Sequence, residues 1–257
     1  PDVVSQISTR AGWHDVVMDQ HAKFYIDHYS NTTQPPQLAL HQADGERLAW
    51  LNENKINSNH PYWPHASEHQ RGEFGQLLGP EGQKLHYRIT TPPNFNVENQ
   101  YPVFIHVYGG PTSRLATNQW SRRALVDQYM AQQGYIVFSL DNRGVVRQGK
   151  AFQDAAYQRL GQIELVDQMV GVDWLRSQPF VDEDNIGIFG WSYGGYLALM
   201  AASQYPDDFA ASVAVAPVTD WTLYDTHYTE RHMGHPQTSG DAYERANVLT
   251  HAHQIAS

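Results

Sequence analysis

The segment Gly190-Trp191-Ser192-Tyr193-Gly194 constrains this chain more than any other feature. An apolar run from Ile186 to Phe189 precedes it, which is typical of a buried strand, and a helical pattern from Tyr193 to Gln204 follows it. A Gly-x-Ser-x-Gly turn between a strand and a helix strains the backbone of its serine, and side chains at the two glycine positions would collide with neighbouring elements. This context favours Ser192 as an exposed nucleophile, with the Tyr193 backbone N–H directed to the same place.

The surrounding sequence predicts a parallel sheet covered by helices. Two runs, Val103 to Tyr108 and Ile136 to Leu140, are continuously apolar, as in strands buried on both faces. Because strands that alternate with helices form βαβ units, we expect an α/β domain here. After a hairpin of Glu73 to Leu77 and Lys84 to Thr90, the predicted order is strand Val103 to Tyr108, helix Arg123 to Gln133, strand Ile136 to Leu140, a helix with Ile163, Val166, Val170 and Trp174 on one face, strand Ile186 to Phe189, helix Tyr193 to Gln204 and strand Ser212 to Val215.

The N-terminal region has a different pattern. Short, aromatic-rich runs around the Asp44-Gly45 turn signal predict an antiparallel meander. The runs are His14 to Met18, Ala22 to Tyr29, Gln37 to Leu40 and Arg47 to Leu51. The polar stretch Asn52 to Gln70 contains two prolines and is typical of a connector. We therefore predict a β-rich domain over residues 1–60 and an α/β domain over residues 61–257.

Composition excludes several classes of function. A formal net charge of −10 and scattered Lys and Arg residues argue against a nucleic-acid partner. The apolar runs are of strand length, so no membrane span is expected. The absence of Cys excludes disulfides and thiolate catalysis, and both cytoplasm and periplasm fit such a chain. The pairs His232/His235 and His251/His253 raise a metalloprotein alternative, but we expect solvated histidines and no metal or other cofactor.

Three segments together carry a family resemblance. They are the turn from Gly190 to Gly194, called the elbow below, the stretch His106-Val-Tyr108-Gly-Gly-Pro111 and the stretch Asp141-Asn-Arg143-Gly144. In all three, this chain resembles the prolyl oligopeptidase family of serine peptidases. Trp191 and Tyr193 beside the serine, with the sequence from Ala216 to Arg231, are similar to the dipeptidyl peptidase IV subfamily. The resemblance implies an α/β-hydrolase catalytic domain, and the region before it is similar in layout to the end of the family's β-propeller.

The resemblance also implies residue roles. Ser192 would be the nucleophile, and the Tyr108 hydroxyl and the Tyr193 N–H would stabilise the oxyanion. The pocket for the residue before the scissile bond would be lined by the Tyr193 ring with Val218, Trp221, Tyr224 and Tyr228. Spacing alone places Trp221, Tyr224 and Tyr228 on one face of a helix, which without the resemblance is more typical of ordinary core.

Two members of a serine triad have no candidate in this chain. In α/β-hydrolases the order is Ser, acid, His, and the last two follow later strands. The carboxylates after Ser192 (Asp207, Asp208, Asp220 and Asp225) come too early, and no second strand precedes the histidines His227, His232, His235, His251 and His253. We therefore expect a hydrolase domain truncated at its C-terminus, with the Asp and His beyond Ser257, the acidic residues that bind a free amino terminus before Pro1, and little activity in this chain alone.

The predicted function is a serine exopeptidase that releases N-terminal Xaa-Pro or Xaa-Ala dipeptides through an acyl-enzyme on Ser192. The expected partners are peptides with penultimate Pro or Ala, and the full-length protein is compatible with a homodimer. Two alternatives stay open: another hydrolase of this fold, such as an acylaminoacyl peptidase or an esterase, and a non-catalytic binding homologue.

Overall fold

The computed structural model describes residues 4–121 and 123–255, so the predictions that concern Pro1 and Ser257 fall outside the described residues. The chain forms two compact units. The first comprises residues 1–71 and 117–129, and the second comprises residues 72–116 and 130–257. The domain boundary after residue 60 stays a prediction.

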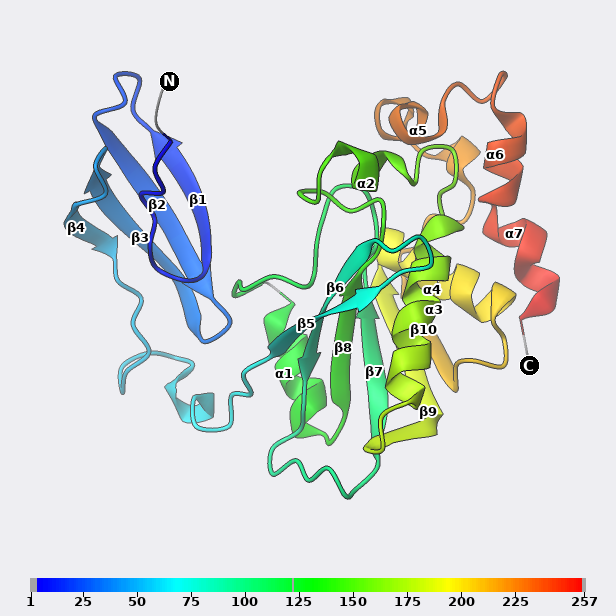
Figure 1. The fold of residues 1–257 in the computed structure, drawn as a ribbon, viewed down its shortest axis with the longest axis horizontal. Coiled ribbons are helices and arrows are strands. Elements are labelled where there is room, and N and C mark those ends of the chain that lie inside the picture. The colour runs from blue at the N-terminus through cyan, green and yellow to red at the C-terminus, as the bar shows by residue number, and fades with distance from the viewer. Residues whose placement is uncertain (1–3, 122, 256–257) are drawn as a thin grey trace. The chain divides into compact units, whose positions relative to one another are not determined.

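The first unit contains a four-stranded antiparallel meander, β1-β2-β3-β4, drawn in blue in Figure 1. Its strands are β1 (Trp13–Met18), β2 (Phe24–Asn31), β3 (Gln34–Gln42) and β4 (Arg47–Asn52). Alternate residues of β2 are buried, Tyr25 and Tyr29 among them, as a sheet with one covered face requires. Gly45 turns the chain between β3 and β4 with φ +99°, a backbone conformation that glycine adopts without steric cost. The predicted meander is confirmed.

The connector after β4 packs within the first unit through aromatic contacts. It contains the short 3-10 helix η1 (Trp63–His65). The ring of His69 stacks on Trp120 with centroids 5.1 Å apart, and its Nε2 donates to the Thr32 carbonyl at 2.7 Å. Tyr62 meets Trp120 edge-on, also at 5.1 Å. These contacts explain why residues 117–129 belong to the first unit.

The second unit is built on a six-stranded mixed sheet in the order β10-β9-β7-β8-β6-β5 (Figure 1). Its strands are β5 (Glu73–Leu78), β6 (Lys84–Thr90), β7 (Tyr101–Val107), β8 (Ile136–Asp141), β9 (Val181–Trp191) and β10 (Ala211–Val215). The four strands from β10 to β8 are parallel, and β6 and β5 are antiparallel additions. Every residue of β8 is buried, as its continuous apolar sequence predicts.

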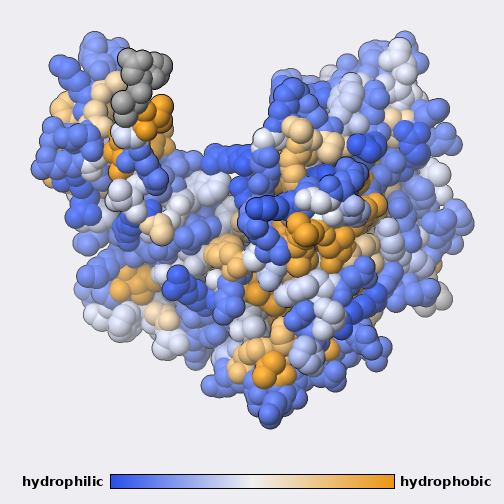
Figure 2. Space-filling view, viewed as in Figure 1, coloured by the Kyte–Doolittle hydropathy of each residue, from blue (hydrophilic) through white to orange (hydrophobic). Residues whose placement is uncertain are grey.

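Helices lie between the parallel strands of this sheet along the chain, and further helices follow its last strand, β10. They are α1 (Ala124–Gln132), α2 (Lys150–Asp154), α3 (Ile163–Arg176), α4 (Tyr193–Gln204), η2 (Trp221–Leu223), α5 (Thr226–Met233), α6 (Gly240–Arg245), α7 (Val248–His251) and η3 (Ala252–Gln254). The predicted α/β class is confirmed. In Figure 2 apolar residues form separate patches between polar ones, which is ordinary for a protein surface. Within the described residues, no helix has the length and apolar character that a membrane crossing needs.

The predicted apolar face of α3 is confirmed for Ile163, Val170 and Trp174, which pack in or against the core, but not for Val166. Val166 is 40% exposed, whereas Glu164 and Asp167 are fully buried. The buried face also carries Gly171, where an added Cβ would lie 3.0 Å from the Phe138 ring of β8. Because the helix turns this face to the sheet, two carboxylates enter the interior and must find partners there.

Candidate active site

The strand order places two predicted site residues side by side. From β7 the chain continues to β8 on one side, and from β9 it continues to β10 on the other. The carboxyl ends of such diverging strands form a crevice where α/β proteins bind ligands. Val107 of β7 pairs with Gly190 of β9, so Tyr108 and Ser192 leave the sheet at the same edge.

Ser192 occupies a strained elbow between β9 and α4. Its φ of +57° and ψ of −116° lie in a backbone region that residues with a side chain rarely adopt. The Ser192 N–H donates to the Val215 carbonyl at 2.9 Å, and its own carbonyl accepts from the Tyr196 N–H at 2.9 Å. These two hydrogen bonds hold the serine backbone between β10 and the first turn of α4.

The elbow glycines are required by close backbone approach. A Cβ at Gly190 would lie 2.1 Å from the backbone of Gly194, and a Cβ at Gly194 would lie 2.2 Å from the Val107 carbonyl oxygen. Real Cβ atoms do not approach backbone so closely. The sequence expectation of steric conflict at these positions agrees with this geometry.

Replacing Gly194 with alanine is expected to destabilise the protein by at least about 1–3 kcal/mol, because the new methyl group must displace β7 or α4. Gly240→Ala is the matched control, since a Cβ there meets nothing within 4 Å. Thermal unfolding of both variants measures the difference. Equal unfolding temperatures for the two would contradict the tight elbow.

The structure joins the predicted aromatic residues into one cluster. The Tyr193 ring lies 6.1 Å from that of Tyr108 and 5.5 Å from that of Trp221, measured between centroids. Trp221 stacks on Tyr228 at 6.0 Å, and Tyr224 meets both rings edge-on. The cluster therefore reaches from Tyr108, after β7, to the pocket residues predicted for the peptide.

The aromatic residues do not share one helix, so that part of the prediction is wrong. Trp221 lies in η2, Tyr224 is extended, and α5 begins only at Thr226. Asp220 caps η2 by accepting from the Thr222 N–H, and Asp225 caps α5 by accepting from the Tyr228 N–H. The two caps break the segment into separate turns, and the rings converge through tertiary packing.

Exposure differs among the predicted pocket residues. Trp221 is 1% exposed and Tyr224 is 44% exposed. Val218 follows β10 and is half-buried against the apolar core, as is Tyr228. Ser192 and Tyr108 are also half-buried. The buried Trp221 and the exposed Tyr224 together suit a small apolar group that enters from solvent.

A buried carboxyl group, missed by the sequence analysis, holds the Tyr193 side chain. The Tyr193 hydroxyl donates to Oε1 of Glu164 at 2.5 Å, and both residues are almost completely buried. Burial raises the pKa of Glu164 to about 8, although the hydrogen bond from Tyr193 acts in the opposite direction. Burial and the nearby Glu164 charge raise the pKa of Tyr193 well above its usual value. The phenol is therefore a neutral donor.

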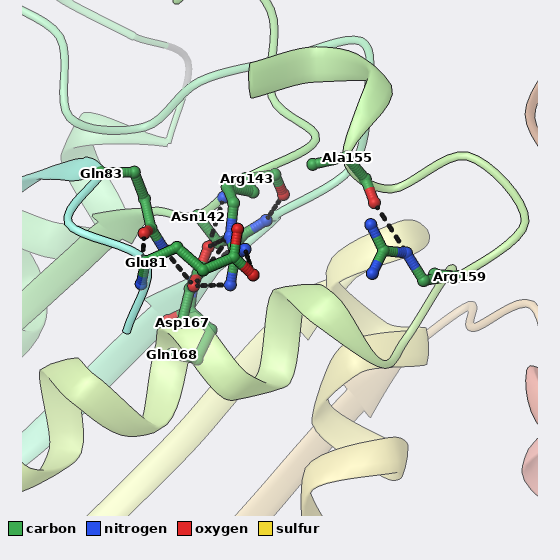
Figure 3. Close-up of polar contacts among 8 residues, drawn as sticks. All are labelled: Glu81, Gln83, Asn142, Arg143, Ala155, Arg159, Asp167 and Gln168. Carbon is green, nitrogen blue, oxygen red and sulfur yellow. Dashed lines mark hydrogen bonds and ion pairs between the residues drawn. The ribbon is translucent and has the colours of Figure 1, made fainter. Parts of the chain in front are cut away.

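The Asn142 side chain links the turn after Tyr108 to α3, and Figure 3 shows Asn142 with its neighbours Gln168 and Arg143. The Asn142 amide donates to the Gly109 carbonyl at 2.9 Å and accepts from Gln168 of α3 at 2.8 Å. Arg143 forms a buried ion pair with Asp167 at 2.8 Å and reaches Glu81 at 2.7 Å. The loop after β8 is thus fixed to α3 on one side and to the turn after β7 on the other.

Several of the carboxylates and histidines after Ser192 have other partners. Asp220 and Asp225 are helix caps, and Asp208 pairs with Arg176. His232 packs on the Tyr228 ring at 4.8 Å, and burial lowers its pKa. In the described part of the chain, no histidine hydrogen-bonds to the Ser192 hydroxyl. No group of three or more metal-ligating side chains occurs among these residues either.

Comparison with known proteins decides the family. The sequence pattern of the prolyl oligopeptidase family matches residues 120–257. The chain belongs to this family. Dipeptidyl peptidase 8 of Mus musculus is 33% identical over all of this chain, and dipeptidyl peptidase 4 of Trichophyton equinum is 31% identical over 88% of it. The crystal structure of Porphyromonas gingivalis dipeptidyl peptidase 4 superposes with a TM-score of 0.90 at 31% identity over 98% of this chain.

These similarities confirm the predicted resemblance to dipeptidyl peptidases and the predicted fold class, an α/β-hydrolase domain preceded by propeller-like strands. The chain spans 29% of the mouse relative and 35% of the bacterial structure. Sequence reasoning missed Glu164, Asn142 and Gln168, whose partners lie 29, 33 and 26 residues away along the chain. The spacing of Glu164, Asp167 and Gln168 on one helical face was the available signal, but it is also typical of a solvated face.

Proposed function

We propose that the protein carrying this chain is a serine exopeptidase that releases N-terminal Xaa-Pro or Xaa-Ala dipeptides from peptides. One observation carries the proposal: a continuous set of aromatic contacts runs from Tyr108 through Tyr193 to Trp221 and Tyr228, directly beside the Ser192 elbow. Such rings suit the apolar ring of proline or the methyl group of alanine. No cofactor takes part in the proposed reaction.

The proposed chemistry is acyl transfer. The Ser192 Oγ attacks the carbonyl carbon of the penultimate residue while its proton passes to the predicted base, and the Tyr108 hydroxyl and the Tyr193 N–H stabilise the resulting oxyanion. The C–N bond then breaks, the departing amine takes a proton, and water hydrolyses the ester on Ser192. The base and its acid stay predicted beyond Ser257, in the order that α/β-hydrolases use.

The proposed substrate class is tested with the full-length protein and matched substrates. We expect Gly-Pro and Ala-Pro chromogenic amides to be turned over, Gly-Leu amide to react much more slowly, and N-acetyl-Gly-Pro amide to be resistant. Preference for short acyl esters over the amides would instead indicate an esterase, and preference for the acetylated amide would indicate an acylaminoacyl peptidase. Failure of a labelled organophosphate to modify Ser192 would indicate a non-catalytic homologue.

Homodimerisation of the full-length protein also stays a prediction.

A further inference from the structure

Glu164 is a fully buried polar residue of the second unit, as Asp167 and Asn142 are. It occupies the first turn of α3 and is 0% exposed. Its Oε1 accepts the Tyr193 hydroxyl hydrogen bond, and its Oε2 has no hydrogen-bond partner among the described residues. Burying a carboxyl group costs free energy that a purely apolar side chain would avoid. The hydrogen bond with Tyr193 suggests that the buried carboxyl group positions the Tyr193 side chain.

The Tyr193 ring lies between the turn that follows Tyr108 and the side chain of Trp221. A Cβ on Gly110 would lie 2.7 Å from Cγ of Tyr193, so this ring rests directly on the turn that follows Tyr108. Its other contacts are with Trp221 at 5.5 Å and with Tyr196 at 5.4 Å. The hydrogen bond of the Tyr193 hydroxyl therefore restrains a ring that contacts both the turn after Tyr108 and Trp221.

The charged and titratable groups around Glu164 come from several elements. Asp167 lies one turn further along α3, Tyr193 and Tyr196 belong to α4, and Tyr228 belongs to α5. The Cβ position of Gly144, in the loop after β8, lies 4.0 Å from Oε1 of Glu164. These neighbours supply phenols and one further carboxylate, and Asp167 already pairs with Arg143.

We propose that Glu164 is a positioning residue for the peptidase site: by accepting the Tyr193 hydrogen bond, it fixes the Tyr193 ring between the Tyr108 turn and Trp221, and so sets the fit of the penultimate residue. This inference rests on the proposed function. Glu164 touches no substrate. It acts through the Tyr193 ring, so its loss affects binding of the penultimate residue more than the chemistry at Ser192.

The test uses the full-length protein with Gly-Pro and Gly-Ala chromogenic amides. Glu164→Leu removes the acceptor and should raise KM for Gly-Pro amide by roughly tenfold or more, with a smaller change in kcat, because a displaced ring spoils substrate placement. Tyr193→Phe removes the donor and should give a similar rise. The double variant should be no worse than the worse single variant, since both remove one interaction.

Two controls separate positioning from folding. Glu164→Gln retains an oxygen acceptor and should restore KM to within about threefold of the wild-type value. Asp173→Asn changes an exposed carboxylate of the same helix and should leave KM unchanged. If Glu164→Leu fails to fold, the KM of Tyr193→Phe decides alone, because the phenyl ring retains the packing.

The results distinguish this inference from the proposed function. An unchanged KM and an unchanged Pro-to-Ala preference in Tyr193→Phe and Glu164→Leu, with only a lower unfolding temperature, would show that Glu164 is structural and would overturn the inference. A wild-type protein that hydrolyses neither amide would overturn the proposed function first.

Discussion

Replacing Ser192 with alanine is expected to lower kcat/KM for Gly-Pro amide by about 10⁴–10⁶-fold in the full-length protein, as removal of a serine nucleophile does in other hydrolases. The fold should be unaffected, because alanine has the same backbone restrictions as serine at φ +57° and the two backbone hydrogen bonds of the elbow remain. The loss should therefore appear in kcat, with an unchanged unfolding temperature.

The measurement combines steady-state kinetics with covalent labelling. A labelled organophosphate should modify one peptide of the wild-type protein, the one that contains Ser192, and should leave Ser192→Ala unmodified. Ser67→Ala is the matched control, since Ser67 is an exposed serine of the first unit. A Ser192→Ala protein that keeps more than about one per cent of the wild-type rate would show that another residue is the nucleophile.

The elbow was predictable because its determinants are local. Ser192 lies between a buried strand and a helix, and the glycines on either side are required by backbone contacts that the motif itself encodes. The sheet was predictable for a related reason. Continuous apolar runs such as β8 indicate strands that are covered on both faces, and their alternation with helices fixes the fold class.

The contact between Glu164 and Tyr193 was not predictable in the same way. Glu164 is one of several acidic residues in α3, and its spacing with Asp167 and Gln168 is as typical of a solvated helical face as of a buried one. Its position is decided by Tyr193, which lies 29 residues away and on another helix. The choice of a buried face in α3 therefore follows from tertiary hydrogen bonds that a periodicity analysis does not include.

The aromatic cluster shows an intermediate case. The spacing of Trp221, Tyr224 and Tyr228 predicted that the rings would meet, and they do. The predicted cause was wrong, because Asp220 and Asp225 cap two separate turns within the segment. Aspartate next to a helical run is a capping signal, and it was present in the sequence.

Tyr108 is the residue whose proposed role depends most on tertiary structure, and its loss should have the second largest effect. Tyr108→Phe is expected to lower kcat by about 10²–10³-fold with little change in KM, because the hydroxyl would stabilise charge only in the transition state. The phenyl ring should keep its contact with Tyr193, whose centroid lies 6.1 Å away. The variant loses the 3.3 Å contact between the Tyr108 and Thr112 hydroxyls, whereas Thr112 itself is unchanged.

Kinetics of Tyr108→Phe and of a matched control test this role. Tyr129 belongs to the first unit and is 60% exposed, so Tyr129→Phe removes a phenolic hydroxyl that has no part in the proposed reaction and should leave kcat unchanged. Organophosphate labelling of Ser192 should still occur in Tyr108→Phe, although more slowly, because the nucleophile is intact. If kcat stays within about threefold of the wild-type value, Tyr108 does not stabilise the oxyanion, and its hydroxyl serves only the packing of the turn that follows β7.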